Sequence, residues 1–463
     1  MANPAYRPRT PRWLLAPLGL AALIGCTSPL DVELSVVVSE AIPTVVTVTW
    51  EPEHPAADPM RIELGSGPTL DREFTALPTD DGKCRATLVG LKPSTTYRLR
   101  AVEIDGGTTY ASDRLTVETG PAPAGMPGLT VERTPGRSPA GGFLVTSLLS
   151  NPSWAVIIDE DGDYVWWHTP GDEWERSFVP RAHLSADGAH VLYEASASAL
   201  TGEDDSVTGE RMLVRVSLDG TEVDTVSLEG CHHDFVELPG GNVAAIVSDV
   251  REVDGEEVEG DRIVELDWDG VEQGSWSAWD HIEYDPADVT ADDDPGWTHA
   301  NALDHDPADD SYTLSLRNQD TILRIDRASG EIRWRLGGVH NDFDAALNVL
   351  PLFQRQHQFQ RLDSSILVFD NGTVDDMRSR AVEYALDEGN MTAQQIWTHV
   401  DDPPLFSIGF GDVTRLPSDH TLVTWSSAGQ IDEVTEDGVL VWRMNAAMGA
   451  GFGYTVWAAA PVD

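Results

Sequence analysis

The chain has 463 residues, of which 41% are hydrophobic, so it can bury a sizeable core as two domains or as one large repeat fold. It carries 78 acidic residues against 30 basic ones, giving a formal net charge of −48, and its lysines are Lys83 and Lys92. This balance excludes nucleic acid as an expected partner, because a basic surface is lacking. Such an acidic excess is typical of highly soluble proteins or of proteins from a salty habitat. A bound anion would need an arginine close to it to offset the negative charge.

The N-terminus has the layout of a secretory signal. Three arginines (Arg7, Arg9 and Arg12) precede the apolar run 13–25, which ends in the sequence LIGC at Cys26. We interpret residues 1–26 as a lipoprotein signal peptide with a lipobox, after which Cys26 becomes the lipidated first residue. A single transmembrane anchor is the alternative, but roughly 12 apolar residues fall short of the roughly 20 that span a bilayer. The sequence therefore predicts an exported lipoprotein on the periplasmic or cell-surface face of the outer membrane, with a lipid anchor as its only membrane contact.

Residues 31–120 read as a β-sandwich. Alternating segments such as VELSVVV, TVVTVTW and TYRLRAVE predict short strands, and Tyr97 follows the sequence LKPST. This region resembles a fibronectin type III or similar immunoglobulin-like domain, in which a tyrosine braces a corner through a backbone hydrogen bond. A Pro/Gly-rich linker over residues 121–130 follows. Cys84 and Cys231 fall in different predicted domains, so we expect no disulfide framework.

The remainder, residues 131–463, repeats. A strand, a polar turn with glycine and a second strand recur six times at spacings of 49 to 60 residues, with turn glycines at 162, 220, 270, 330, 389 and 438. Another strand pair precedes most of these units, giving about four strands each. Four-stranded units at this period are typical of propeller blades, whereas a β-helix or an array of sandwiches would have shorter or less hairpin-like repeats. The predicted fold is therefore all-β, with a six-bladed β-propeller after the sandwich.

Histidines recur at matching strand ends in three of these units. They are His232 and His233, then His299 in the sequence THAN, then His357. Residues that begin the innermost strands of a propeller point toward a common axis, so these side chains are expected to converge. Strand alternation puts His299 and Asn301 on one face. Arg317, in the next predicted strand, sits among apolar neighbours and needs an anionic partner.

At these residues the sequence resembles the PAPS-independent bacterial aryl-sulfate sulfotransferases. The similarity rests on THAN followed by SLRNQDTILRIDRASGEIRWRLGG, on HHDF, and on QRQHQF running into ILVFDNG and RAVEYALDE, and it covers most of residues 140–445. The resemblance implies a propeller with an N-terminal sandwich and a ping-pong transfer between phenols through a sulfohistidine. It places the nucleophile on His357 and supporting roles on His299, Asn301, Arg317 and one of His232 and His233. Well-studied periplasmic members carry a disulfide near the active site, which this chain lacks.

The proposed chemistry needs three kinds of group. A neutral imidazole at His357 can attack sulfur and hold the group covalently. Arg317 and Asn301 would bind the nonbridging oxygens as charge spreads. His299 or His233 could protonate the leaving phenolate and later deprotonate the acceptor phenol. The expected partners are a small aryl sulfate donor and a phenol acceptor, with no metal and no cofactor, and no phosphate-binding loop of the Walker type is present.

The sequence is also compatible with other functions. An aryl sulfatase would use the same site with water as the acceptor, and a noncatalytic cell-surface propeller would bind without chemistry. A zinc or copper site is less compatible with Arg317 beside the ligands. The acidic segments 159–163 and 285–296 are interpreted as a hairpin turn and a solvated loop rather than calcium sites. Four aromatic residues could flank an aryl substrate but are expected in the core, namely Trp297, Phe353, Phe359 and Phe406.

Overall fold

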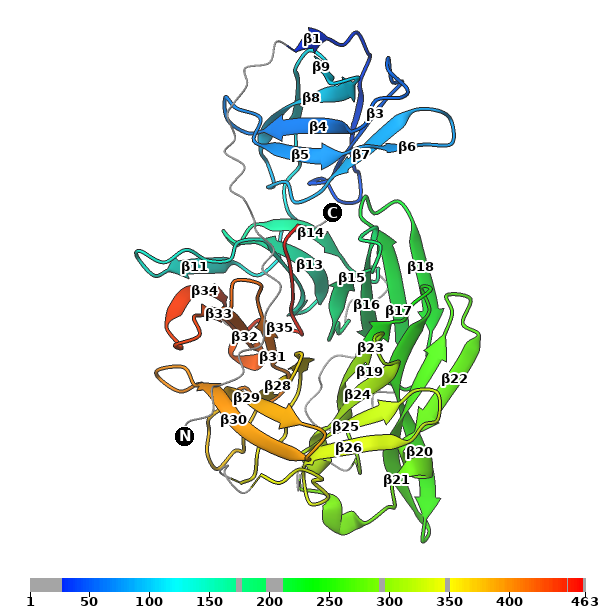
Figure 1. Cartoon of the computed structure of the whole chain (residues 1–463), viewed down its shortest axis with the longest axis vertical. Helices are drawn as coiled ribbons and strands as arrows, with labels where there is room; N and C mark the ends of the chain where they lie inside the picture. The colour runs from blue at the N-terminus through cyan, green and yellow to red at the C-terminus, as the bar shows by residue number, and fades with distance from the viewer. Residues whose placement is uncertain are drawn as a thin grey trace, which may run out of the picture.

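The computed structural model describes residues 27–171, 177–196, 211–290, 296–345, 350–447 and 449–460 (Figure 1). The predicted signal peptide and Cys26 lie outside these ranges. The all-β prediction is confirmed, because the regular secondary structure of the described residues consists of strands apart from four short helical turns: α1 (Ala278–His281), η1 (Pro286–Asp288), η2 (Arg317–Gln319) and η3 (Ser426–Ala428). None of the described helices has the length and apolarity needed to cross a membrane.

The N-terminal region consists of two antiparallel sheets that pack face to face. One contains β1 (Ser28–Pro29), β4 (Met60–Gly65), β5 (Arg72–Thr75), β8 (Thr96–Asp105), β9 (Thr108–Ala111) and β10 (Leu115–Glu118), with β1 pairing in parallel, and the other β2 (Ser35–Val38), β3 (Val46–Trp50), β6 (Leu77–Pro78) and β7 (Cys84–Leu88). Inward-facing residues of both sheets form one apolar core, which includes Trp50 and Leu99. The Tyr97 hydroxyl accepts a hydrogen bond from the Lys92 backbone N–H at 2.9 Å, which is the corner contact expected of this residue.

Six further sheets follow along the chain, and we number them in order. Sheet 1 has β12 (Phe143–Leu149), β13 (Trp154–Asp159), β14 (Tyr164–His168), β35 (Gly451–Phe452) and β36 (Val456–Ala458); sheet 2 has β15 (Ala182–Leu184), β16 (His190–Ser196), β17 (Arg211–Ser217) and β18 (Val223–Ser227); sheet 3 has β19 (Cys231–Glu237), β20 (Val243–Val253), β21 (Glu256–Leu266) and β22 (Glu272–Ser277). Sheet 4 has β23 (Ala300–Asp306), β24 (Ser311–Leu316), β25 (Thr321–Asp326) and β26 (Ile332–Gly337); sheet 5 has β27 (Phe359–Arg361), β28 (Ser365–Asp370), β29 (Arg380–Asp387) and β30 (Thr392–His399); sheet 6 has β31 (Asp412–Arg415), β32 (Thr421–Trp425), β33 (Gln430–Val434), β34 (Leu440–Ala446) and β11 (Leu129–Arg133).

The repeat read from the sequence matches these sheets. Each predicted turn glycine lies in the hairpin between the third and fourth strands of a sheet, or between β13 and β14 in sheet 1. Five of the six adopt the left-handed conformation that such turns favour in glycine, and near Gly389 the left-handed residue is Met391 instead. The hairpin interpretation of residues 159–163 is therefore confirmed.

The two ends of this region are hydrogen-bonded to sheets that lie far away in the sequence. β35 and β36 pair with β12 on the edge opposite β13, and β11 pairs with β34. We call β15, β19, β23, β27, β31 and the β35/β36 pair the first strands of their sheets. β19 lies beside β23, and β27 lies beside β31. The first strands therefore share one interior, and their N-terminal ends position the candidate site.

The N-terminal sandwich packs onto sheets 1 and 2 (Figure 1). Ile42, Val45 and Val89 of the sandwich belong to the same buried cluster as Trp166 of β14. The hairpin at Gly220 approaches so closely that a Cβ there would lie 2.9 Å from the Ala41 side chain, so glycine is required by space as well as by its φ of 71°.

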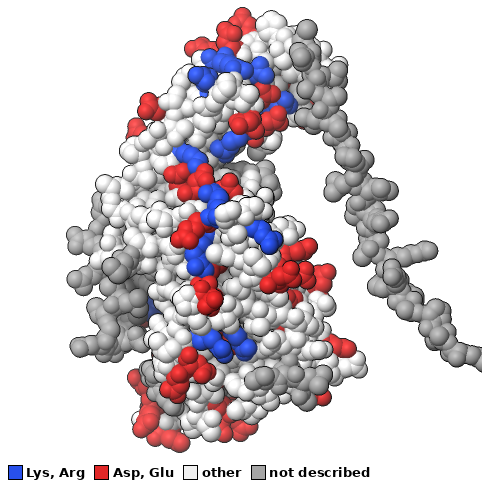
Figure 2. All heavy atoms as spheres, turned by 90° about the vertical axis from the view of Figure 1, so that its left-hand side faces the viewer, with Lys and Arg blue, Asp and Glu red and all other residues white. Residues whose placement is uncertain are grey.

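A lysine joins the two regions electrostatically. Lys92 Nζ lies 3.1, 2.7 and 2.7 Å from the carboxylates of Asp159, Asp161 and Asp163 in the β13–β14 turn. These carboxylates form the one group of described residues that could hold a metal ion, and the ammonium of Lys92 contacts all three. Figure 2 shows the same local pairing on a larger scale, with basic side chains set among acidic ones along one face.

Candidate active site

The structure brings the predicted histidines together at the starts of the first strands. His233, at the start of β19, has its Nε2 3.3 Å from Nε2 of His299, which directly precedes β23. The ring of His233 lies 6.4 Å from the ring of His357, which precedes β27. His232 Nδ1 lies 2.8 Å from His233 Nδ1. Sheets 3, 4 and 5 thus each contribute imidazoles to one cluster.

Two β-bulges aim these side chains. The pairing of β19 with β20 shifts register between Cys231 and Phe235, and that of β23 with β24 shifts at Asn301. His233 and His299 have φ values of 66° and 45°, a region that is costly for side chains other than glycine and that clusters at functional sites. Bulges are a means of redirecting a side chain at the end of a strand.

The expectation that His299 and Asn301 share a face is wrong, because regular alternation does not hold across the bulge. His299 contacts His233 of sheet 3, whereas Asn301 Nδ2 donates to the backbone oxygen of Gln356, next to sheet 5, at 2.8 Å. Asn301 is fully buried, and its Oδ1 makes no hydrogen bond. Its side chain thus links two of the histidine-bearing segments.

Arg317 lies in η2 rather than in a strand. The 3₁₀ turn follows β24 directly, and the Arg317 backbone N–H donates to the His299 oxygen at 3.1 Å. Its Nη1 donates to Asn318 Oδ1 at 2.7 Å, which orients the guanidinium. The side chain is largely buried, and its charge contributes to lowering the pKa of His357. The guanidinium of Arg317 is therefore close enough to His357 to influence it electrostatically.

The hydrogen bonds of His357 define its tautomer. Asn371 Nδ2 donates to the backbone oxygens of Ser407 and Phe410, at 2.8 and 2.7 Å, so its Oδ1 is the atom that faces His357. His357 Nδ1 lies 2.8 Å from that oxygen and 3.2 Å from the Arg355 backbone oxygen. Because both partners are acceptors, Nδ1 carries the hydrogen and Nε2 has the lone pair. Nε2 forms no hydrogen bond with a described residue, so its lone pair is not engaged by the part of the chain that the structure describes.

The other histidines form a chain that ends at a carboxylate. His232 Nε2 lies 2.8 Å from Asp261 Oδ1, and Asp261 Oδ2 accepts hydrogen bonds from Ala300 N and Thr298 Oγ1 at 2.5 and 2.6 Å. Burial acts to raise the pKa of Asp261, but His232 and these donors outweigh it and hold the pKa below its ordinary value. His232 Nε2 therefore donates to a charged carboxylate, and in the neutral chain its Nδ1 accepts from His233 Nδ1. This leaves the His233 Nε2 lone pair facing His299.

A buried aspartate ties the three segments together beneath the histidines. Asp234 Oδ2 accepts from Leu303 N of β23 at 2.9 Å and from Gln358 Nε2, beside β27, at 2.6 Å. Its Oδ1 lies 3.3 Å from Nε of Arg181, which precedes β15. Asp234 directly follows His233, and Gln358 directly follows His357. One carboxylate thus links the strands that carry the clustered imidazoles.

Aromatic rings from the opposite sheets cover the cluster. Phe410, which precedes β31, lies 5.7 Å from the His233 ring and 5.9 Å from the His357 ring. It also contacts Phe178 at 5.5 Å and Tyr454 at 5.4 Å between ring centroids. The next residue, Gly411, has a φ of 124°, and a Cβ there would lie 2.2 Å from Phe369, so a glycine is what allows this approach.

Burial dominates the electrostatics of the imidazoles. Burial, followed by the positive charge of Arg317, lowers the pKa of His357 to about 3. Burial likewise lowers the pKa of His233 well below its ordinary value, with neighbouring His299 acting in the same direction. Both imidazoles are therefore neutral near pH 7, as a nucleophile or a base requires.

The sequence predicted the histidines and Arg317 as site residues but not the residues that hydrogen-bond to them or pack against them. Asp261, Asn371, Asp234 and Phe410 come from positions without a recognisable local pattern; the DNG after a buried strand and the GFG at 409–411 were the only signals. Trp297, Phe353 and Phe359 are buried, in line with the core interpretation, and Phe406 is half-buried. Cys84 and Cys231 are buried free thiols, as expected.

Comparisons with known proteins agree with the sequence motifs. Solved structures that resemble the chain include a protein of unknown function from Bacteroides caccae (14% identity, 69% of this chain and 98% of that chain, TM-score 0.43). A catalytically inactive virginiamycin B lyase from Staphylococcus aureus (12%, 68% and 87%, TM-score 0.37) and a putative 6-phosphogluconolactonase from Bacteroides uniformis (13%, 67% and 99%, TM-score 0.38) are also similar. No curated protein matches the chain. The model of the arylsulfotransferase (ASST) family matches residues 130–442, about two thirds of the chain including every residue of the histidine cluster, and the chain therefore belongs to that family.

Proposed function

We propose that this protein transfers a sulfuryl group from an aryl sulfate to a phenol by a ping-pong mechanism without PAPS, through a sulfohistidine at His357. The single observation that carries the proposal is the Nε2 lone pair of His357. It is fixed by Asn371, kept neutral by burial and placed beside the guanidinium of Arg317. The family match supports sulfotransferase activity with a small-molecule donor and acceptor.

In the first half-reaction, His357 Nε2 forms a bond to sulfur while the bond between sulfur and the aryl oxygen breaks. The electron pair leaves on the phenolate oxygen, which takes a proton from His299, because His233 is neutral with its Nε2 lone pair facing His299. Arg317 and the second Nδ2 hydrogen of Asn301 stabilise the nonbridging oxygens. Before the leaving phenolate is protonated, the chain of imidazoles must carry one additional proton. The negative charge of Asp261, at the end of the chain, stabilises that proton.

In the second half-reaction, the same imidazole chain removes the proton of the acceptor phenol. The phenol oxygen bonds to sulfur, the bond between nitrogen and sulfur breaks, and its electrons return to His357 Nε2. Phe410 and Phe178 offer aromatic faces beside the cluster on which an aryl ring can stack. One site thus serves both the donor and the acceptor.

We further propose that the six sheets form a closed six-bladed propeller, preceded by a fibronectin type III-like sandwich. The pairing of β35 and β36 with β12, and of β11 with β34, supports closure, because chain ends then complete the first and last blades. By its N-terminal sequence the protein is an exported lipoprotein anchored through Cys26, on the periplasmic or cell-surface face of the outer membrane.

The test is intact-protein mass spectrometry after brief exposure to an aryl sulfate. The wild type should gain one sulfuryl group and release about one equivalent of phenol before any acceptor is added. His357→Ala should show neither adduct nor burst. His340→Ala is the matched control, because His340 is exposed and pairs with Asp288 outside the cluster. Undiminished transfer by His357→Ala would refute the assignment of the nucleophile.

Three other outcomes would replace or change the proposal. Release of phenol that continues without an acceptor would identify an aryl sulfatase, with water attacking the sulfohistidine. Absence of any turnover of aryl sulfates by the folded protein would favour a noncatalytic binding propeller. Adduct mapped to His299 or His233 would move the nucleophile to that residue.

A further inference from the structure

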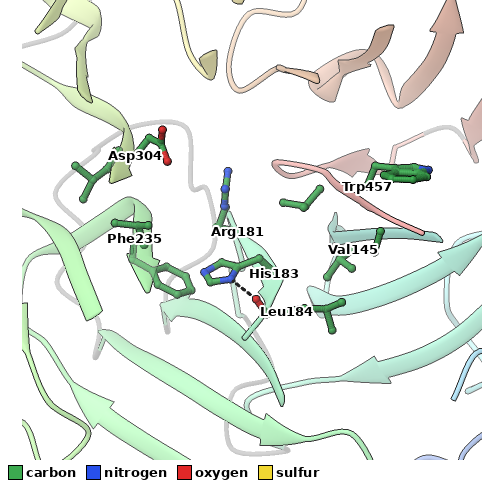
Figure 3. Close-up of a pocket in the computed structure, with 11 residues that line it drawn as sticks. Val145, Arg181, His183, Leu184, Phe235, Asp304 and Trp457 are labelled. Carbon is green, nitrogen blue, oxygen red and sulfur yellow. Dashed lines mark hydrogen bonds between the residues drawn. The ribbon is translucent and has the colours of Figure 1, made fainter. Parts of the chain in front are cut away.

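A second hollow lies farther along the same first strands. This pocket of about 340 Å³ is lined by residues of β12, β15, β19, β23 and β36, together with Arg181 (Figure 3). Phe235 and Asp304 line it, and they follow His233 and His299 by two and five positions along the chain. At about 3.3 Å per residue, these lining residues lie roughly 7 Å and at most about 17 Å beyond the two histidines. Its volume is at the lower end of the range of small-molecule sites.

Arg181 presents a guanidinium to this pocket. Its side chain is 16% exposed, its Nε lies 3.3 Å from Asp234 Oδ1 without hydrogen-bond geometry, and its charge lies 5.7 Å from the Tyr454 ring. In the described part of the chain, no residue accepts a hydrogen bond from its nitrogens. A guanidinium has five donors, and here Nε is buried without a hydrogen-bond acceptor among the described residues, which is costly. The pocket therefore favours a ligand with an acceptor group at Arg181.

Two acceptors lie on the same wall. His183 Nδ1 lies 2.9 Å from the Leu184 backbone oxygen, so it carries the hydrogen and Nε2 has the lone pair. That Nε2 is buried and has no hydrogen-bond partner among the described residues. Figure 3 shows the carboxylate of Asp304 and the guanidinium of Arg181 directed into one space, with His183 beside Phe235. A hydrogen-bond donor on the ligand would therefore find two acceptors, the Asp304 carboxylate and His183 Nε2.

The rest of the pocket is apolar. The ring of Phe235 packs against His183 at 4.8 Å, and Val145 and Trp457 form the opposite side. Trp457 Nε1 already donates to the Gly141 oxygen at 2.7 Å, so its ring offers only an apolar face. The pocket thus combines one donor fork, two acceptors and a hydrophobic wall.

We propose that this pocket binds a small zwitterion with an apolar body, the chemistry of an apolar α-amino acid. The carboxylate would accept from Arg181, the ammonium would donate to Asp304 and His183 Nε2, and the apolar body would lie between Phe235 and Trp457. A simple anion would meet the carboxylate of Asp304 in the same space, and a simple amine would offer no acceptor to the guanidinium of Arg181. The zwitterion site uses none of the imidazoles of the sulfuryl-transfer proposal. Each proposal can therefore be tested without the other.

The experiment is isothermal titration calorimetry of the full-length protein with three ligands that share one ring. L-Phenylalanine should bind about tenfold or more tightly than 3-phenylpropanoate, which lacks the ammonium, or 2-phenylethylamine, which lacks the carboxylate. Asp304→Asn should weaken phenylalanine binding about tenfold or more and leave sulfuryl transfer unchanged. Asp254→Asn, in the exposed β20–β21 turn, is the matched control and should bind as the wild type does.

Each alternative result overturns the proposal. Equal affinity for either singly charged analogue would assign the pocket to an anion or an amine. No binding of phenylalanine at millimolar concentration by the folded wild type would show that no zwitterion is recognised. Unchanged affinity in Asp304→Asn, verified as folded by its thermal unfolding curve, would place bound phenylalanine elsewhere. None of these outcomes depends on whether aryl sulfates turn over.

Discussion

Sheets 3, 4 and 5 differ from sheets 6, 1 and 2 in what they place at the entry of their first strands. The former carry His233, His299 and His357, whose side chains meet one another. The latter carry Phe410, Tyr454 and Arg181, whose side chains cover or support that cluster. Similar sheets thus carry the histidine cluster in one half of the molecule and the residues around it in the other. The two halves differ in the residue at the entry of the first strand, not in the sheet.

The two halves meet at buried charges. Asp234 of sheet 3 faces Arg181 of sheet 2, and Arg181 also lies near Asp412 of sheet 6. Burial raises the pKa of Asp412 to about 7, although Arg181 acts to lower it. An ion pair therefore joins the sheets that carry the histidines to the sheets that surround them.

Breaking that ion pair should have the largest effect. Asp234→Asn keeps an oxygen for Leu303 N and Gln358 but removes the carboxylate that acts most strongly on the buried charge of Arg181. We expect a loss of about 3–5 kcal/mol in the free energy of unfolding, measured by denaturant titration. The rate of transfer should fall more than the affinity for donor, because the histidines lose their spacing.

The double variant Asp234→Asn/Arg181→Met removes both charges and provides the control. It should recover part of the lost stability, since no buried charge is left alone. Equal stability of Asp234→Asn and wild type would show that the two halves are not coupled through this pair.

Arg317→Lys tests the reactive half alone. Lysine keeps the positive charge but loses the planar pair of donors, so formation of the adduct should slow by about 10- to 1000-fold. Rapid-quench measurement of the phenol burst gives this rate directly. Arg333→Lys, on the outer strand of the same sheet, is the matched control and should leave the rate unchanged. A rate unaffected by Arg317→Lys would remove the arginine from the transition state.

Phe410→Leu tests the supporting half. Leucine is apolar but cannot stack on an aryl ring, so KM for an aryl sulfate should rise about 3- to 10-fold with little change in kcat. Phe406→Leu is the control, because Phe406 is half-buried in the same segment and makes no ring contact with the histidines among the described residues. Equal KM values for the two variants would mean that the ring over the histidines does not contact substrate.

The sequence predicted the sheets well because their hairpins are local. Each turn glycine sits between two adjacent strands, so period and turn chemistry suffice to place it. The histidines were found because short motifs surround them. The relation of His299 to Asn301 was mispredicted, since a bulge and a left-handed residue cannot be seen in an alternating pattern.

The supporting residues were beyond local reasoning for a different reason. Asn371 acts on His357 only because the strand β28 returns beside it, and Asp234 acts through Gln358, which is 124 residues away in the sequence. An aspartate or asparagine at the edge of a buried strand is common in any β protein. Such partners become visible only when the sheets are assembled around the shared interior.

The smallest expected effect concerns pH, and it distinguishes a buried nucleophile from an exposed one. Burial and Arg317 lower the pKa of His357 from its ordinary 6.5 to about 3, so its imidazole stays neutral as the pH falls from about 8 to about 5. The rate of adduct formation with donor alone should then change less than about twofold, whereas an imidazole of ordinary pKa would lose roughly 30-fold by pH 5. The unfolded chain binds a proton at this histidine near pH 6.5 and the folded protein does not, so stability falls as the pH drops from 6.5 toward 3. Each rate must therefore be paired with a circular dichroism spectrum that shows folded protein. If the rate of adduct formation by folded protein instead fell below about pH 6.5, His357 would have an ordinary pKa. Burial would then not keep this imidazole neutral, and it would not distinguish His357 from an exposed histidine.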